Sequence, residues 1–466
     1  MRRALVGLVA AWLLSAPATV FAHGGLKSSV PASGASLNVA PTEIRLVFTE
    51  AVELAFTRVE LRGPNGAVQL MAPSFTGADR RTVVSPIAAQ LAAGHYTVTW
   101  QVAGADGHPV RGSFTFAIGP DASGLAPAPT ISANTDRDSV HAHHDPATFP
   151  DAGGFDAGSP LYVMIRWLQF IAVLALTGAV AFRLVVLALF AKNRRPDSPM
   201  LTPASRQAAN VGFYAALVLA AVVLMRLVAQ SYAMHAPGTG FAPALMWPMI
   251  GRTTWGWGWL LQLMTTAVAI AGFSAAREGR SRGWVIAAVG AVLGAFAPAL
   301  SGHAASAPIL RPLAIFADGV HILGASGWLG SLLVLLVAGI PAAMRLGPQE
   351  RGPAVADLVS VYSPTALVFA GVTAVAGTFS GWIHLGTIPA LWQTDYGKTL
   401  LVKLAVLAIV TATGAYNFLY VRPRLGKIDG VENITRSATI EVGVAVIVLL
   451  VTAVLVATPT AMDRPN

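Results

Sequence analysis

The pattern of apolar and polar positions divides the chain into two regions of different character. Residues 43–48, 96–100 and 113–116 alternate polar and apolar side chains, as strands with one buried face do. Turn-forming stretches such as residues 63–66, Gly-Pro-Asn-Gly, separate these segments. The pattern predicts a compact antiparallel β-sandwich of immunoglobulin-like, Greek-key type over residues 23–119.

The second region consists of long apolar runs, each close to the ~20 residues that an α-helix needs to cross a bilayer. These runs predict a polytopic bundle of eight transmembrane helices within residues 159–460, followed by a short tail at 461–466. The fold class is therefore a β domain joined to an α-helical membrane domain. The predicted helices cover about residues 161–190, 208–230, 255–276, 283–301, 312–340, 364–386, 399–421 and 437–458.

The first 22 residues have the pattern of a secretory signal peptide. Arg2 and Arg3 precede an apolar stretch, and Val20-Phe21-Ala22 places small residues where signal peptidase cuts. Cleavage there makes His23 the first residue of the mature chain.

Residues 120–158 are rich in Ala, Pro, Asp, Ser and Gly and have no apolar period, which is typical of a flexible linker. The linker contains His141, His143 and His144. These histidines fit either a solvated tether or a weak metal-capture tract that feeds the membrane domain.

Composition agrees with a membrane protein and excludes several kinds of chemistry. Hydrophobic residues make up 55% of the chain and charged residues 11%, against about 25% charged in soluble globular proteins. Cysteine is absent, so disulfides, thiolate metal sites and cysteine nucleophiles are excluded. The net charge of +9 is not concentrated on the β region, which gives no reason to expect nucleic acid as a partner.

The charges between the predicted helices indicate the orientation of the bundle. Thirteen Lys and Arg residues lie in the loops that follow odd-numbered helices, against four in the other loops and the tail. Because basic loops stay in the cytoplasm, both ends of the mature chain are expected outside it. We expect a multi-pass protein of the bacterial inner membrane, with its β domain and C-terminus in the periplasm.

The β domain holds a candidate copper site. An N-terminal His23 offers its α-amine and its ring Nδ1 together, and the turn Asp106-Gly107-His108 between two predicted strands offers a second imidazole, which makes three nitrogens. Tetragonal nitrogen ligation of this kind suits Cu(II). The sequence therefore predicts a Cu(II) site at His23 and His108, with Asp106 on the same side of the turn as His108.

Three further candidate ligands lie in the membrane domain. Asp318 and His321 are spaced i,i+3 and share one helix face, and His303 lies at the outer end of the preceding helix. Ionisable groups inside a bilayer are costly and generally mark a function. These residues predict a cation path in the outer half of the bundle, although an interfacial role explains His303 alone equally well.

Residues 23–119 resemble the CopC family of periplasmic copper-binding domains. The likeness rests on the His start, Ser29-Val30-Pro31-Ala32-Ser33-Gly34, Arg45 through Glu50, Tyr96 through Trp100, and Asp106 through Gly112. The resemblance implies Cu(II) binding at His23, Asp106 and His108, with Glu50 as a second-sphere residue or weak ligand. This domain has only Met71 after the mature start, so a separate methionine site for Cu(I) is not expected.

The membrane region resembles the CopD family. The matching residues are Ser301-Gly302-His303-Ala304, Asp318 and His321 ahead of Gly327-Trp328-Leu329-Gly330, Thr394-Asp395-Tyr396-Gly397, Lys403, Asn417, Arg436 and Glu441. The resemblance implies a copper-handling membrane domain fused behind its soluble partner.

Together these features predict a copper homeostasis or resistance protein, and not an enzyme. The outer domain captures Cu(II), and the bundle imports copper as Cu(I) or Cu(II). Copper ions, the lipid bilayer and periplasmic copper chaperones are the expected partners. Two alternatives remain: a histidine-brace copper oxidase or monooxygenase, and a membrane-tethered copper buffer or sensor without transport.

Overall fold

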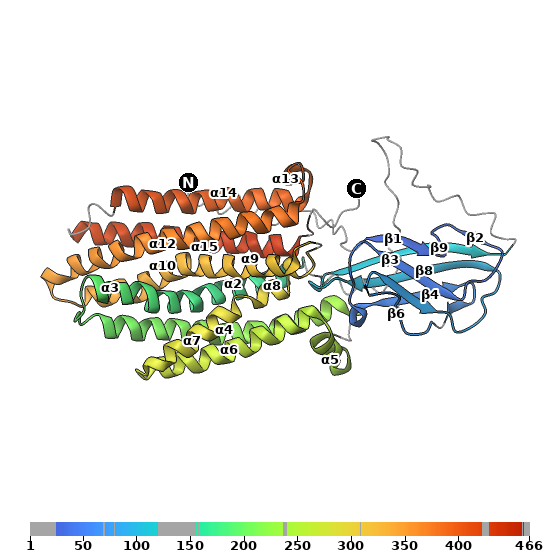
Figure 1. The fold of residues 1–466 in the computed structure, drawn as a ribbon, viewed down its shortest axis with the longest axis horizontal. Helices are drawn as coiled ribbons and strands as arrows, with labels where there is room; N and C mark the ends of the chain where they lie inside the picture. Colours follow the sequence, from blue (N-terminus) through green and yellow to red (C-terminus); the bar gives the residue numbers. More distant parts are fainter. Residues whose placement is uncertain are drawn as a thin grey trace.

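The computed structural model places a β-sandwich against one end of a bundle of long helices (Figure 1). It describes residues 25–119 without 69 and 79, residues 155–458 without 157, 236–239, 308 and 422–427, and residue 460. The predicted leader 1–22, His23, the linker histidines and the tail 461–466 lie outside the described residues.

Two sheets form the sandwich, as the alternating pattern predicts. One sheet has the strand order β1-β3-β7-β6 and the other β2-β9-β8-β4-β5; among the described pairs only β2 and β9 run parallel. The strands are β1 (Leu26–Val30), β2 (Ser36–Leu37), β3 (Glu43–Phe48), β4 (Arg58–Gly63), β5 (Gly66–Val68), β6 (Ser74–Phe75), β7 (Thr82–Pro86), β8 (Gly94–Ala103) and β9 (Pro109–Ile118).

The core of the sandwich follows directly from this alternation. Every second residue of β3, namely Ile44, Leu46 and Phe48, is almost wholly buried, and Phe48 meets Trp100 of β8 edge-on with ring centroids 5.3 Å apart. Strands β8 and β9 pair over their full ten residues. This long, fully paired hairpin therefore holds its connecting turn at the end of the sandwich that faces the bundle.

Eight helices in the described part of the chain are long and apolar enough to cross a membrane, which confirms the predicted bundle. The spans comprise α2 (Pro160–Ala181), η3 (Phe182–Val186) and α3 (Leu187–Asn193); α4 (Leu201–Met234); α6 (Thr254–Arg277); α7 (Ser281–Gly294) and α8 (Ala297–Leu300); α9 (Arg311–Ala325), η5 (Ser326–Gly330), α10 (Ser331–Val334), η6 (Leu335–Gly339) and α11 (Ile340–Met344); α12 (Pro348–Leu385); α14 (Asp395–Tyr416) and η7 (Asn417–Val421); and α15 (Ile428–Ala457). The short elements η1 (Leu54–Phe56), α5 (Pro243–Arg252), η4 (His303–Ala305) and α13 (Ala390–Gln393) complete the fold.

The sixth span starts earlier than the apolar pattern predicts. We expected a start near residue 364, but α12 begins at Pro348 and continues through Pro364. A proline inside a helix removes one backbone hydrogen bond. The extra turns bury Ala354, Val355 and Leu358 completely, and this packing outweighs that loss.

The fifth span is interrupted by two π-helical turns, η5 and η6. At the first of them the backbones of two spans nearly touch, because a Cβ added to Gly178 of α2 would lie 2.2 Å from the carbonyl carbon of Gly330. Small residues allow such close helix crossings in membrane proteins. The crossing fixes the position of Trp328 within the bundle.

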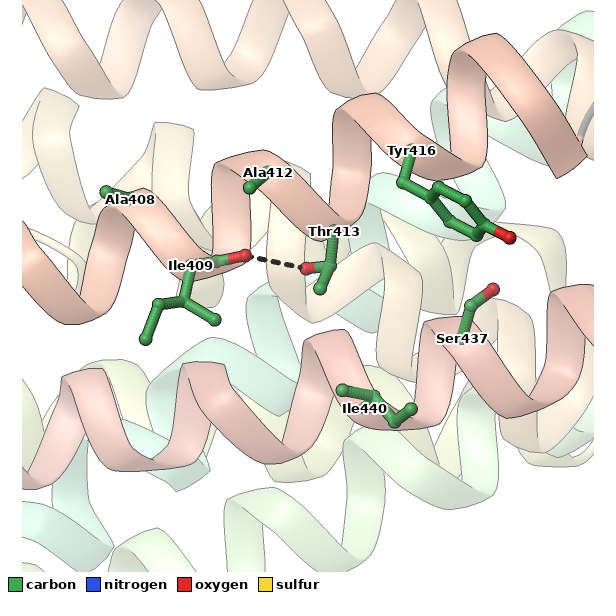
Figure 2. A pocket seen from close by; sticks show the side chains of 7 residues that line it. All are labelled: Ala408, Ile409, Ala412, Thr413, Tyr416, Ser437 and Ile440. Atoms are coloured by element: carbon green, nitrogen blue, oxygen red, sulfur yellow. Dashed lines mark hydrogen bonds between the residues drawn. The ribbon is translucent and has the colours of Figure 1, made fainter. Parts of the chain in front are cut away.

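An open groove of about 530 Å³ runs between α14 and α15 (Figure 2). Its lining is mostly apolar, and Thr413 donates its hydroxyl hydrogen to the backbone oxygen of Ile409 at 3.0 Å rather than pointing a free polar group into the groove. The groove therefore resembles the lipid-facing surface of a span. The lining residues are Ala408, Ile409, Ala412, Thr413, Tyr416, Ser437 and Ile440.

Candidate metal centre

The turn between β8 and β9 holds the predicted Asp106-Gly107-His108 motif. Gly107 donates its N–H to the Gly104 oxygen at 3.0 Å and has φ +76°, a left-handed conformation that glycine adopts without strain. A Cβ at Gly107 would lie 2.8 Å from Gln230 Nε2 and 2.9 Å from Trp255. The turn is therefore pressed directly against α4 and α6.

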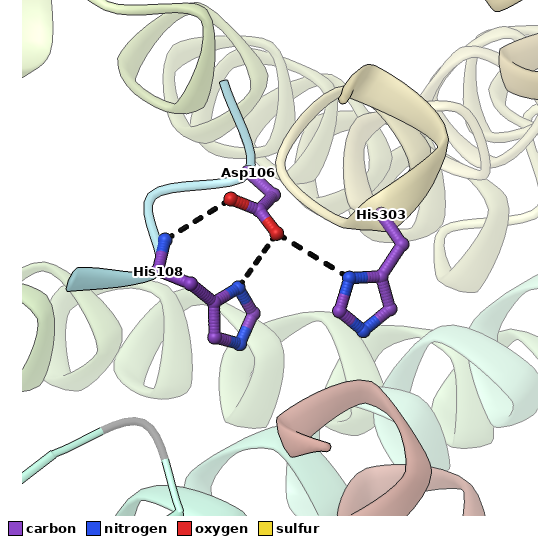
Figure 3. Close-up of side chains that lie close together, drawn as sticks. All are labelled: Asp106, His108 and His303. Atoms are coloured by element: carbon purple, nitrogen blue, oxygen red, sulfur yellow. Dashed lines mark hydrogen bonds and ion pairs between the residues drawn. The ribbon is translucent and has the colours of Figure 1, made fainter. Parts of the chain in front are cut away.

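Asp106 lies between two imidazoles (Figure 3). Its Oδ1 accepts the backbone N–H of His108 at 3.1 Å, and its Oδ2 lies 2.8 Å from His108 Nδ1 and 3.3 Å from His303 Nδ1. The two rings stack with centroids 5.2 Å apart. His303 belongs to the helical bundle, so one carboxylate connects the two domains.

Burial and charge prepare these groups to bind a metal ion. Burial alone would raise the pKa of Asp106, but the charge and hydrogen bonds of His108 and His303 hold the pKa of that carboxyl well below its usual range. Burial lowers the pKa of His108, although Asp106 opposes this shift. The cluster therefore has an ionised carboxylate and a neutral imidazole, the forms that bind metal.

The donor set fits a divalent transition metal. Asp106, His108 and His303 each place one ligand atom within 4.8 Å of the others, and their exposed fractions are only 5–7%. Imidazole nitrogen with one carboxylate suits copper, zinc or nickel better than magnesium or calcium, which prefer oxygen ligands alone.

Arg226 of α4 holds the segment that carries His303. Its Nη2 donates to the backbone oxygen of Ser301 at 3.0 Å and to the Ser301 hydroxyl oxygen at 2.9 Å, immediately after the end of α8. A cation at a helix C-terminus is favourable because the last carbonyls lack partners within the helix. This buried arginine therefore positions η4 and the imidazole that η4 presents.

The β domain docks on the bundle by forming hydrogen bonds with backbone groups at the ends of two helices. At the end of α4, Gln101 donates to the Met234 oxygen at 2.7 Å and Arg111 donates to the Ala233 oxygen at 3.3 Å. At the start of α6, Oε1 of the buried Glu53 accepts from the backbone N–H and hydroxyl of Thr254, at 3.2 and 3.0 Å. A carboxylate at a helix N-terminus is favoured by the helix dipole.

The bundle also contacts the metal-site turn itself. Gln230 donates its Nε2 hydrogen to the Gly107 oxygen at 2.6 Å and accepts a hydrogen bond from the Tyr162 hydroxyl. Arg166 lies over the Tyr162 ring, 4.2 Å from its centroid. The turn is therefore fixed by a polar contact from Gln230 of α4, which Tyr162 of α2 supports, as well as by packing.

Behind His303, ring contacts lead into the bundle. The His303 ring lies 6.0 Å from that of His384 and 6.2 Å from that of Tyr396, measured between centroids. All three line a cavity of about 220 Å³ that Asp318 and His321 also line. The cavity therefore extends from the cross-domain cluster into the helices.

Asp318 and His321 lie in this cavity but outside the cross-domain cluster. Asp318 Oδ1 accepts from the Ser380 hydroxyl at 2.6 Å, and His321 Nδ1 donates to the Thr373 backbone oxygen at 2.9 Å. The sequence grouped His303 with these two residues, whereas the structure places its ligand atom beside Asp106 and His108.

Glu50 lies next to the cluster without joining its ligand atoms. A Cβ at Gly104 would lie 3.2 Å from Glu50 Oε1 and 3.3 Å from Asp106 Oδ1, so both carboxylates flank the same residue. This placement is compatible with a second-sphere role, which stays a prediction. The predicted N-terminal ligand His23 lies outside the described residues.

Several residues of the centre gave little or no signal in the sequence. Gln101, Glu53 and Gln230 belong to no motif, and their docking contacts join residues more than 100 positions apart. His384 stands at the outer end of its span, where an interfacial position explains it equally well. The only signal for His384 in the sequence is its place at that outer end, where it could join an entrance.

Family models match most of the chain. Residues 26–119 match the CopC domain, residues 156–308 the copper resistance protein D-like N-terminal domain, and residues 356–455 copper resistance protein D. The three matches follow one another along the chain in the order of its sandwich and its helices.

Two curated relatives agree with these matches. The copper transport protein CutJ of Bacillus subtilis is 26% identical over 457 residues, which cover 96% of this chain and 76% of that protein. Copper resistance protein C of Pseudomonas syringae pv. tomato is 35% identical over 123 residues, 25% of this chain and 96% of that protein. The crystal structure of PcoC, a copper resistance protein from Escherichia coli, has 34% identity, covers 21% of this chain and 100% of its own, and gives a TM-score of 0.19.

Proposed function

Because the chain belongs to the copper resistance protein family, as a CopC domain fused to a copper resistance protein D region, we propose that it captures Cu(II) outside the cell membrane and imports copper through its helices. The observation that carries this proposal is the cluster of Asp106, His108 and His303, of which His303 also lines the cavity. A binding site built from both domains delivers its ion directly to the membrane domain.

The route begins where the cation is first held. Asp106 and His108, with His23 as the expected further ligand, bind the incoming ion, and His303 exchanges for one of these ligands. His384 is the next imidazole, 6.0 Å from His303 between ring centroids, and Asp318 and His321 lie deeper in the same cavity. Stepwise exchange between neighbouring donors moves the ion without releasing it to water.

The direction follows from charge. Among the described residues, the basic loops after the first, third and fifth spans lie at the end of the bundle away from the β domain, so the β domain faces the periplasm of a bacterial inner membrane. A cation moving toward the negative cytoplasm gains about 2.3 kcal/mol per charge per 100 mV. Periplasmic copper chaperones are the expected donors of the ion.

Transport is favoured over the two alternatives by the geometry of the cluster. Its residues are only 5–7% exposed, which leaves little room for the flat substrate surface that an oxidase or monooxygenase needs. A tethered buffer would have no use for His303, since a site complete within the β domain would suffice. We therefore propose a transporter and not an enzyme.

Copper accumulation by cells that express the full chain tests this proposal. We expect His303→Ala, Asp318→Asn and His321→Ala each to reduce accumulation at least tenfold, while His95→Ala, an exposed histidine of the same β domain, leaves it unchanged. Unchanged accumulation in all three variants would overturn transport through the bundle. Full function of the β domain tethered to an unrelated helix would establish the buffer instead.

A further inference from the structure

A second polar cluster lies within the bundle, beyond the cavity. Glu441 of α15 is 4% exposed and Asn417, the first residue of η7, is 9% exposed. Asn417 Nδ2 donates to Glu441 Oε2 at 3.1 Å, and the Trp328 indole is a second hydrogen-bonding neighbour of this carboxylate. The Tyr362 hydroxyl donates to the Trp328 oxygen at 3.1 Å. Three spans thus meet at one carboxylate, and α12 supports them through Trp328.

This cluster continues the route described above. Ala445 and Trp328 line the cavity, and Glu441 precedes Ala445 by one helical turn, about 6 Å along α15. The cavity-lining residues of α15 run from Ala445 toward Val456, at the end nearer the β domain. Glu441 therefore lies about one helical turn beyond the lining of the cavity, on the side that faces away from the cross-domain cluster.

The carboxylate has no matching positive charge. Among the residues that the structure describes, no lysine, arginine or histidine forms an ion pair with Glu441. Asn417 Oδ1 is buried as well and has no hydrogen-bond partner in the described part of the chain. Two buried oxygens that lack a positively charged partner indicate a site for a cation.

The backbone supports a functional interpretation. Trp328 lies in the π-helical turn η5 and Asn417 begins the π-helical turn η7. Such turns interrupt regular helices and occur frequently at functional sites. The groove of Figure 2 lies between the same two helices, α14 and α15, but its polar lining residues are Thr413, Tyr416 and Ser437, and neither Glu441 nor Asn417 lines it.

Resting on the proposed function, we infer that Glu441 and Asn417 form the inner release site for the copper ion. The ion enters through imidazole nitrogen and leaves through a carboxylate and an amide oxygen. Oxygen ligands hold copper less tightly than imidazole does. A transport path needs such a weaker last site, because an ion that is bound too firmly does not leave.

Uptake of radioactive copper by cells that express the full chain tests this inference. Glu441→Gln keeps the shape of the side chain and removes its charge, so we expect at least a tenfold lower uptake rate. Copper bound to the purified variant at the cross-domain cluster should stay unchanged. Glu441→Asp keeps the charge and should retain at least a third of the rate. The matched control is Glu432→Gln, an exposed glutamate on the same helix, which should transport as the wild type does.

Two results would overturn the inner release site. One is a Glu441→Gln uptake rate within twofold of the Glu432→Gln rate. The other is an equal loss of uptake and of thermal stability in Glu441→Gln and Glu441→Asp, which would show a structural role. If the wild type takes up no more copper than His303→Ala, the proposed function fails instead, so the two failures are distinguishable.

Discussion

The contact of Glu53 with the start of α6 gives a sharp test of how the two domains are held together. Glu53→Ala removes the acceptor of two hydrogen bonds from Thr254, 3.2 and 3.0 Å long, in a position where the glutamate is only 6% exposed. Hydrogen bonds to charged groups contribute about 1.5–3 kcal/mol each, partly offset here by the cost of burying the carboxylate. We therefore expect a loss of about 2–4 kcal/mol of docking free energy.

A loss of this size changes the domain arrangement measurably. Because 1.4 kcal/mol is a tenfold change, the ratio of docked to undocked molecules should decrease by a factor of about thirty to several hundred. The chain has no cysteine, so spin labels at Val39→Cys and Ile388→Cys, both exposed, report one distance between the domains. We expect one narrow distance distribution in the parent and a broad one in Glu53→Ala.

The control is Glu60→Ala, the same substitution at an exposed glutamate of β4. It should leave the distribution narrow. A narrow, unshifted distribution in Glu53→Ala would refute the reasoning, because it would show that the carboxylate contributes little to docking.

Two further predictions concern the surroundings of the cluster. Arg226→Met retains most of the apolar volume of the side chain but removes both hydrogen bonds to Ser301. We expect the copper affinity, measured by competition with a chelator, to fall about 10- to 100-fold, while the helical circular dichroism is kept. Unchanged affinity would contradict a positioning role for Arg226. Burial, followed by the charge of Arg58, lowers the pKa of His235 at the end of α4. As the pH falls below about 6.5, the unfolded chain therefore takes up a proton at this histidine before the folded chain does, and the free energy of unfolding decreases. The thermal midpoint of the metal-free protein should therefore drop between pH 7.5 and pH 5.5, and His235→Gln should flatten this slope; an identical slope in the variant would contradict the assignment.

The sequence predicted those features that depend on local pattern. Strand β3 begins and ends where its alternation does, and Asp106 and His108 lie in the turn that the flanking strands predict. The eight spans follow from apolar length alone, since a bilayer demands it. The predicted start of α12 was wrong because the burial of Ala354 and Leu358 depends on neighbouring spans, which no local pattern reveals.

The cross-domain cluster could not be predicted in the same way. His303 was recognised as a candidate ligand, but its partners depend on how the sandwich docks, and docking rests on Gln101, Glu53 and Gln230. Glutamine and glutamate are common surface residues, and nothing in their spacing shows that they bind helix ends 100 to 200 positions away. The i,i+3 spacing of Asp318 and His321 is visible in the sequence, and for that reason His303 was grouped with these two residues.

The most direct test of the central claim is to count the imidazoles on Cu(II) by pulsed electron paramagnetic resonance, in the full chain and in His303→Ala. If both domains build the site, the full chain shows one more coordinated imidazole than the variant does, whatever His23 contributes. The same number of coordinated imidazoles in both proteins would contradict a centre shared between the sandwich and the bundle.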